Sequence, residues 1–223
     1  MFDTNWNSKI YKKSRQINKY PFDWVVSSVN ALFISKIKEN RKLNAIELGS
    51  GTGNNLKFLK EFGFHKIIGI EGSKSANILA KKFLKNNKSY KLISADFINI
   101  PFKDNYFDLC LDRGSITHND IKSIKQTLTE VKRVLKPGGY FLSSIFSKKH
   151  SEYLNSKNKS QTLKVFKDEM NVKSGIKASF FNFLDLKKIY QDFEILEAIH
   201  EQKIDKINFN DNSAMWNIIL RLK

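Results

Sequence analysis

The sequence predicts an α/β fold, in which helices flank a doubly wound sheet of seven mostly parallel strands. Between residues 43 and 146, five short apolar runs alternate with segments in which apolar residues recur at helical spacing. A glycine-rich turn follows the first run and leads into the first helical segment. Two more apolar runs near the C-terminus are joined by a loop instead of a helix, which predicts an antiparallel pair at the edge of the sheet.

The predicted strands are short runs rich in β-branched and aromatic residues. In chain order they are Leu43–Leu48, Lys66–Glu71, Tyr90–Ala95, Tyr106–Leu111, Tyr140–Phe146, Phe193–His200 and Ala214–Leu222. The helices predicted between or after them are Leu56–Phe62, Ala76–Leu84, Ile121–Leu135 and Leu184–Tyr190. Ser73 and Asp120 stand where two of these helices need an N-cap residue.

Two helices are also predicted ahead of the sheet, at Trp6–Ile17 and Pro21–Ile37. A length of 223 residues suits one domain, in which residues 1–40 form an N-terminal helical cap, residues 41–146 the core and residues 183–223 the C-terminal edge of the sheet. The polar segment 147–182 predicts an insertion or a lid, with a weak helical pattern at Leu163–Met170.

Composition indicates a globular chain of a reducing compartment. Hydrophobic residues make up 41% of the sequence, and the single cysteine, Cys110, excludes an internal disulfide and a zinc site built on paired cysteines. We therefore expect no metal. No apolar run reaches the roughly 18 residues of a membrane span. Residues 1–6 lack the features of a signal peptide, so we expect a cytoplasmic protein.

The formal net charge of +17 raises the question of a nucleic-acid partner. The excess is spread along the chain, at +4, +9 and +4 for residues 1–40, 41–146 and 147–223. Only five of the 39 basic residues are arginine, the usual residue for bidentate recognition of bases and phosphates. The charge is therefore interpreted mainly as a solvated basic surface, and a nucleic-acid partner is not expected.

The glycine-rich turn Gly49–Gly53 carries the sharpest functional signal. It follows a strand, opens a helix and is preceded by Glu47, and a second acid, Glu71, closes the next strand. An acid at about this spacing binds ribose hydroxyls in dinucleotide folds. Asn54 replaces the third glycine of the dinucleotide fingerprint, and a carboxylate beside a pyrophosphate is unfavourable. The pattern favours an adenosyl ligand with a cationic amino-acid end over a nicotinamide dinucleotide.

Six segments, in order along the chain, resemble class I S-adenosylmethionine-dependent methyltransferases. Within that family they are similar to the methyltransferases of type 11, in the branch that acts on small molecules. They are ELGSGTG (47–53), GIEGS (69–73), SADF (94–97), INIPFKDNYFDL (98–109), LDRGSITH (111–118) and RVLKPGGYF (133–141). The resemblance implies a seven-stranded Rossmann-like sheet with N-terminal helices and an antiparallel edge strand. It also implies S-adenosylmethionine as the cofactor, bound by residues 41–146.

The resemblance assigns cofactor-binding roles to residues at the carboxyl ends of four strands. The methionine part and the ribose face would contact Glu47, Gly49, Ser50, Gly51 and Gly53. Glu71 would accept hydrogen bonds from the ribose hydroxyls, and Gly72, Asp96 and Phe97 would lie around the adenine. Asp112, Arg113 and Gly114 would lie beside the sulfonium.

A hydroxyl or ammonium acceptor must lose a proton, so a general base is expected. His118 is the first candidate, because it follows the fourth strand and histidine has an ordinary pKa of about 6.5. Asp112 is the second candidate, and Asp120 is a third that better suits an N-cap. In relatives, helices before the sheet shape the acceptor pocket, so Tyr11, Tyr20 and Trp24, together with His118, are candidates for binding the acceptor.

The expected acceptor is a small polar, anionic metabolite methylated on oxygen or nitrogen, such as a surface-glycan or nucleotide-linked precursor. Positive charge would raise the local concentration of such an anion. A nucleic-acid methyltransferase is one alternative, although residues 112–115 read Asp-Arg-Gly-Ser instead of an Asn/Asp-Pro-Pro-aromatic motif. A cofactor-binding module without catalysis is the other alternative.

Overall fold

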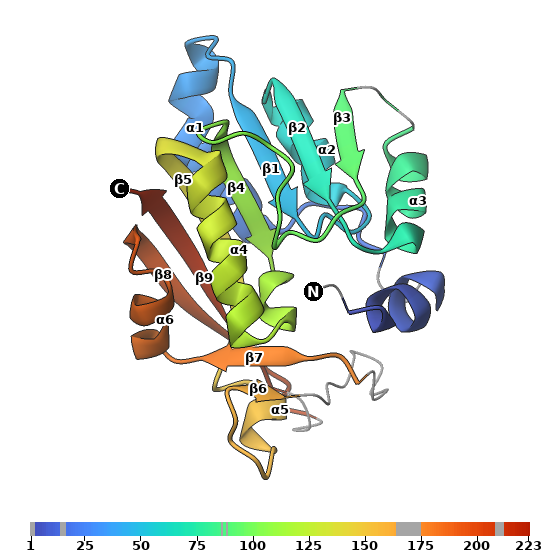
Figure 1. The fold of residues 1–223 in the computed structure, drawn as a ribbon, viewed down its shortest axis with the longest axis vertical. Helices are drawn as coiled ribbons and strands as arrows, with labels where there is room; N and C mark the ends of the chain where they lie inside the picture. Colours follow the sequence, from blue (N-terminus) through green and yellow to red (C-terminus); the bar gives the residue numbers. More distant parts are fainter. Residues whose placement is uncertain (1–2, 14–16, 86, 88, 164–174, 208–211) are drawn as a thin grey trace.

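A computed structural model describes residues 3–13, 17–85, 87, 89–163, 175–207 and 212–223. A twisted sheet runs through it, with helices on both faces (Figure 1). Its strands are β1 (Asn44–Leu48), β2 (Lys66–Ile70), β3 (Tyr90–Ile93), β4 (Phe107–Arg113), β5 (Leu135–Ser147), β6 (Thr162–Leu163), β7 (Ala178–Phe181), β8 (Phe193–Ile204) and β9 (Asn212–Leu222).

The predicted α/β architecture is confirmed. The order β3-β2-β1-β4-β5 is parallel throughout, β9 pairs antiparallel with β5, and β8 pairs antiparallel with β9 at the edge. The predicted number of seven strands is wrong, because the described sheet has nine. The two additional strands are β6 and β7, which are only two and four residues long and lie within a segment whose pattern is mainly polar.

Six α-helices are described: α1 (Asp23–Lys38), α2 (Asn54–Phe62), α3 (Lys74–Phe83), α4 (Ile121–Val134), α5 (Ser151–Leu154) and α6 (Phe183–Ile189). The predicted caps are confirmed, since the Ser73 hydroxyl accepts from Ala76 N–H and the Asp120 carboxylate accepts from Ser123 N–H. Most of the predicted Leu163–Met170 helix lies outside the described residues, and Leu163 itself belongs to β6.

Two apolar cores hold the helices against opposite faces of the sheet. On β1, Ile46 packs into one core with α4, while its neighbour Ala45 packs into the other with α1 and α2. This alternation follows from the two-residue period of a strand. It explains why a sheet with buried strands needs helices on both sides.

The first predicted helix, Trp6–Ile17, is wrong in form. A single π-helical turn at Trp6–Ile10 is followed by a 3₁₀ turn at Tyr11–Lys13, and residues 14–16 lie outside the described part. Contacts of this segment with α3 and with His118 hold it in place, so it does not form a regular α-helix. Within the described ranges, no helix is both long enough and apolar enough to cross a membrane.

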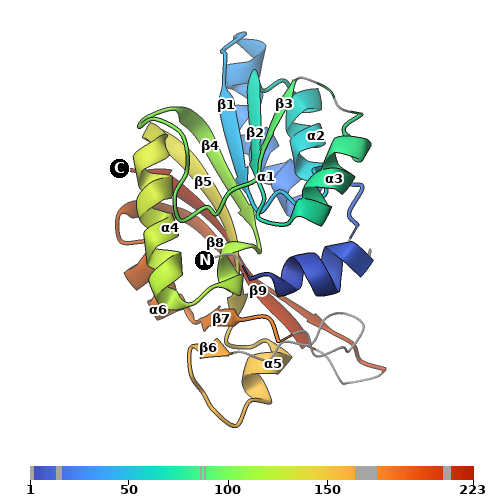
Figure 2. The ribbon, with the colours of Figure 1, turned by 45° about the vertical axis from the view of Figure 1, so that its right-hand side comes forward.

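The parallel strands point their carboxyl ends toward the Trp6–Lys13 segment, which lies beside α3 in both views (Figures 1 and 2). The loops that follow β1, β2 and β4 therefore meet at one edge of the sheet. In open α/β sheets this edge is where ligands bind.

Candidate active site

The loop after β1 depends on glycine. Gly49, Gly51 and Gly53 have φ values of 67°, 51° and 83°, which residues with a side chain rarely adopt. A Cβ atom added to Gly49 would lie 2.0 Å from Ser115 Oγ. The N–H groups of Gly49 and Ser50 both donate to the carbonyl of Ile70, at 2.8 and 3.1 Å. These bonds fix the loop against the end of β2.

Glu71 joins this loop to the start of the next helix. Its side chain is 5% exposed, Oε2 accepts from Gly51 N–H at 2.9 Å, and Oε1 accepts from Ser73 N–H at 2.7 Å. Burial raises the pKa of Glu71, and the backbone donors oppose that rise. Each carboxylate oxygen has a second lone pair, so both can accept one more hydrogen bond from a ligand.

Glu47 is buried with an oxygen that has no partner. It is 2% exposed, and Oε1 accepts from Asn55 Nδ2 at 2.7 Å. Among the described residues, neither Glu47 Oε2 nor the hydroxyl of Ser50 finds a hydrogen-bond partner. Burial raises the pKa of Glu47 to about 8, and the charges of Asp112 and Glu71 add to that rise. A buried acid with an unused oxygen fits a cationic ligand group.

Asn54 and Asn55 connect the loop to the chain ahead of α1. Asn54 Nδ2 donates to the Tyr20 carbonyl at 2.9 Å, and Asn55 Oδ1 accepts from Phe22 N–H at 3.3 Å. Because Asn55 also donates to Glu47, one side chain joins the N-terminal segment to the buried acid. No functional role was predicted for these residues from the sequence. Their only signal in the sequence is a pair of polar residues at the start of a helix.

The N-terminal segment covers the loop. Asn7 Oδ1 accepts from Ser73 Oγ and from Ser75 N–H, both at 3.0 Å, which attaches it to the start of α3. A Cβ on Gly51 would lie 2.7 Å from the Tyr11 hydroxyl, so this phenol sits directly on the loop. Burial, followed by the charges of Glu71 and Glu47, raises the pKa of Tyr11. Tyr11 was expected to line the acceptor site, and the structure places it at the expected cofactor loop.

Asp112 holds the turn after β4. It is fully buried, Oδ1 accepts from the N–H groups of Ser115 and Ile116 at 2.8 and 3.0 Å, and Oδ2 accepts from Ser143 Oγ at 3.4 Å. Burial raises its pKa to about 7. These contacts suit a residue that positions Ser115 against the glycine loop, since Ser115 Oγ donates to the Gly49 carbonyl at 3.2 Å.

We expect Asp112→Ala to lower the free energy of unfolding by about 2–3 kcal/mol, because two buried N–H donors lose their acceptor. Asp112→Asn keeps one carbonyl oxygen for those donors and should lose less than half as much. Equilibrium denaturation of both variants checks this. Equal losses of unfolding free energy in the alanine and asparagine variants would show that Asp112 does not stabilise the protein through the two backbone hydrogen bonds.

Arg113 and Gly114 follow Asp112 and face the α1 side of the sheet. The Arg113 guanidinium lies 4.3 Å from the centre of the Phe22 ring, and its Nη1 donates to Met215 Sδ at 3.3 Å. Its Nε finds no hydrogen-bond partner among the described residues. Burial lowers the pKa of Arg113, while the charges of Glu201, Asp112 and Asp23 oppose that change. Gly114 has a φ of 78° and lies close to Met215.

His118 lies in an aromatic environment. Its ring centre is 4.7 Å from Trp6 and 5.2 Å from Phe146, and Nδ1 is 3.3 Å from the Lys177 carbonyl. The side chain is 9% exposed, and this burial lowers its pKa to about 4. A histidine with so low a pKa is a weak base near neutral pH.

The remaining predicted residues lie at different depths. Gly72, Asp96 and Phe97 are half-buried and follow β2 and β3 at the same sheet edge. Asp96 Oδ1 accepts from Ile98 N–H at 3.2 Å. Tyr20 is 83% exposed, whereas Trp24 is buried on α1.

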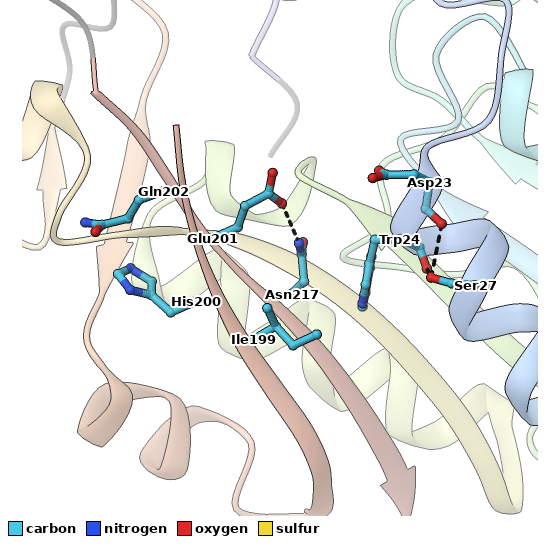
Figure 3. A pocket seen from close by; sticks show the side chains of 8 residues that line it. All are labelled: Asp23, Trp24, Ser27, Ile199, His200, Glu201, Gln202 and Asn217. Carbon is cyan, nitrogen blue, oxygen red and sulfur yellow. Dashed lines mark hydrogen bonds between the residues drawn. The ribbon is translucent and has the colours of Figure 1, made fainter. Parts of the chain in front are cut away.

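A cavity of about 640 Å³ that is open to solvent lies between α1 and the β8–β9 hairpin. Figure 3 shows Asp23 and Trp24 on the α1 side, opposite Glu201 and Asn217. Of the residues predicted to bind the acceptor, only Trp24 lines this cavity. A volume of this size suits a small molecule or one inserted side chain.

Comparisons with known proteins agree with this geometry. Residues 46–143 match the family model described as a methyltransferase domain. The human protein EEF1A lysine methyltransferase 2 is 35% identical over 141 residues, which cover 57% of this chain. That match spans 58% of the human protein, which is less than two thirds of its length.

Solved structures share the fold. An S-adenosylmethionine-dependent methyltransferase of Methanosarcina mazei matches with a TM-score of 0.66 at 20% identity, covering 83% of this chain and 97% of that one. The Burkholderia thailandensis 1,6-didemethyltoxoflavin-N1-methyltransferase, solved with S-adenosylhomocysteine, matches with a TM-score of 0.66 at 13% identity, covering 97% and 85%.

Proposed function

We propose that the chain transfers a methyl group from S-adenosylmethionine to an amine nitrogen, such as that of a protein lysine. The proposal is supported by the match of residues 46–143 to the family model of a methyltransferase domain and by the fold shared with solved S-adenosylmethionine-dependent methyltransferases. The observation that carries the proposal is the pair of buried acids, Glu47 and Glu71, at the glycine loop. The unused Glu47 oxygen suits the cofactor's ammonium group, and Glu71 suits its ribose hydroxyls.

The bound cofactor supplies a methyl group on a positively charged sulfur, which makes the methyl carbon reactive toward a nucleophile. The chain's own residues hold the two reactants in line and exclude water. Glu71 and Glu47 orient the cofactor, while Gly49–Gly53 lets the backbone approach it closely. Tyr11 covers the loop from the N-terminal side, and Asp112 fixes the turn that bears Ser115.

The acceptor class has two candidates. An amine is supported by the named activity of the human relative and by the carboxylates of Asp23 and Glu201 in the cavity. A small polar anion, methylated on oxygen or nitrogen, is supported by the net charge of +17. We favour the amine, because carboxylates in a cavity attract cations and repel anions. The cytoplasmic location and the single-domain organisation expected from the sequence are part of this proposal.

Methyl transfer from radiolabelled S-adenosylmethionine tests the proposal. We expect label to enter lysine-containing protein or peptide acceptors and not phosphorylated metabolites or sugar nucleotides. If label enters only the anionic metabolites, the acceptor is the small polar anion and not an amine. Binding of S-adenosylhomocysteine without methyl transfer to any acceptor would contradict the proposal and support a cofactor-binding module without catalysis.

None of the three candidate bases suits proton abstraction: His118 is a weak base near neutral pH, Asp112 is buried on two backbone donors, and Asp120 caps α4. We therefore expect an amine to react after losing its proton to water. His118→Ala should then keep more than a tenth of the wild-type kcat and bind S-adenosylhomocysteine within twofold of the wild type, because the lowered pKa of His118 makes it a weak base. Steady-state kinetics at pH 7–9 measure this. A hundredfold loss of kcat with unchanged cofactor affinity would restore His118 as the base.

A further inference from the structure

We infer that the cavity between α1 and the β8–β9 hairpin binds the acceptor's cationic side chain, with Asp23 and Glu201 as the residues that select an ammonium group. This inference rests on the proposed function and deepens it. The cavity has a volume of about 640 Å³, and its lining on the α1 side begins at Asp23, directly after Phe22.

The lining of the cavity differs from the rest of the chain in the sign of its charge. The described residues that line the cavity include two carboxylates and no lysine or arginine, although the chain as a whole carries 39 basic and 22 acidic residues. Burial, followed by the charge of Lys149, lowers the pKa of His200, the remaining titratable group of the lining, which keeps it uncharged near neutral pH. The residues of the lining are therefore negative where the chain is positive, and the cation that interacts with both carboxylates, Arg113, lies outside the lining.

Both carboxylates are accessible to a ligand. The Asp23 carboxylate is exposed, and it interacts electrostatically with Arg113. Glu201 Oε2 accepts from Asn217 Nδ2 at 3.0 Å, which orients the side chain (Figure 3). Its Oε1 lies 3.1 Å from Lys203 Nζ, but Lys203 is 74% exposed, and such surface pairs contribute little.

The indole of Trp24 forms part of the cavity wall. This side chain is 9% exposed, lines the cavity and has a ring nitrogen without a hydrogen-bond partner among the described residues. Figure 3 shows the ring between α1 and Asn217. The face of a tryptophan attracts ammonium and guanidinium groups. Carboxylates and an aromatic wall together favour a long cationic side chain over a neutral or anionic one.

Hydrogen bonds connect the start of α1, beside the cavity, to the glycine loop. Phe22 precedes Asp23, and its N–H donates to Asn55, whose side chain donates in turn to Glu47. Arg113, at the end of β4, stacks on Phe22 and interacts electrostatically with both Glu201 and Asp23. A side chain seated in the cavity would thus lie next to the elements that hold the cofactor loop.

The test compares binding of three probes to protein saturated with S-adenosylhomocysteine. N-acetyl-lysine methylamide carries the ammonium, the norleucine analogue is its neutral counterpart, and the glutamate analogue is anionic. We expect the lysine probe to bind at least tenfold more tightly than the other two at pH 7, as measured by ligand-detected NMR titration. In the double variant Asp23→Asn, Glu201→Gln, this preference should fall to within twofold.

The matched control is Glu39→Gln, Glu194→Gln, which removes the same charge from α1's C-terminal cap and from the outer part of β8, away from the cavity. It should keep the full preference. Equal binding of all three probes, or a preference that survives in the Asp23 and Glu201 variant, would overturn the inference. The proposed function fails separately, if S-adenosylhomocysteine does not bind or no acceptor is methylated.

Discussion

Gly49→Ala is expected to lower the free energy of unfolding by about 2–5 kcal/mol. The left-handed conformation at φ 67° costs a residue with a side chain about 1–2 kcal/mol. The new Cβ would also lie 2.0 Å from Ser115 Oγ and 2.4 Å from Ser115 Cβ, and overpacking of this kind costs about 1–3 kcal/mol. Urea denaturation at equilibrium measures the sum.

Gly138→Ala is the matched control. Gly138 has a similar φ of 72°, but an added Cβ would meet nothing within 4 Å, so only the backbone cost of about 1–2 kcal/mol should appear. Adding Ser115→Gly to Gly49→Ala should recover part of the loss by removing the clash. Equal stability of the Gly49 and Gly138 variants would contradict the close contact between the glycine loop and the turn after β4.

The unliganded protein is expected to lose stability as the pH rises from about 5 to about 8. The pKa of Glu47 is raised from 4.5 to about 8 in the folded protein, so across this window the folded state holds a proton that the unfolded state has released. Asp112, with a pKa raised to about 7, acts in the same direction. Glu47→Gln should therefore reduce the slope of unfolding free energy against pH without abolishing it.

The same group should link pH to cofactor affinity. A ligand ammonium beside Glu47 favours the ionised carboxylate, so S-adenosylhomocysteine should bind more tightly at pH 8 than at pH 6, with release of up to about one proton at the lower pH. Calorimetry in buffers of different ionisation enthalpy counts that proton. If Glu47→Gln shows the same pH dependence of affinity as the wild type, Glu47 does not contact the ammonium group of the cofactor.

The sequence was most informative where structure depends on neighbouring residues. The glycine turn between β1 and α2 and the N-caps Ser73 and Asp120 rest on contacts within a few residues, so the pattern alone predicts them. The antiparallel edge followed from two apolar runs without a helix between them. The short strands β6 and β7 have too few residues for a strand period to be recognised.

The site was less predictable where partners lie far apart along the chain. Tyr11 meets Gly51, and Asn54 reaches the Tyr20 carbonyl, contacts that only the folded chain creates. The lowered pKa of His118 results from its burial beside Trp6 and Phe146, which no local pattern contains. Likewise, Asp23 and Glu201 stand far apart in the sequence and meet only across one cavity.

Calorimetric titration of S-adenosylhomocysteine into the wild-type protein and into Glu71→Ala tests whether the loop Gly49–Gly53 and Glu71 bind the cofactor. Charged hydrogen bonds of about 1.5–3 kcal/mol to the ribose should be lost, so the variant should bind about 10- to 150-fold more weakly while the wild type binds S-adenosylhomocysteine and not NAD. Unchanged affinity in Glu71→Ala, or binding of NAD in place of S-adenosylhomocysteine, would contradict the assignment of this loop as the cofactor site.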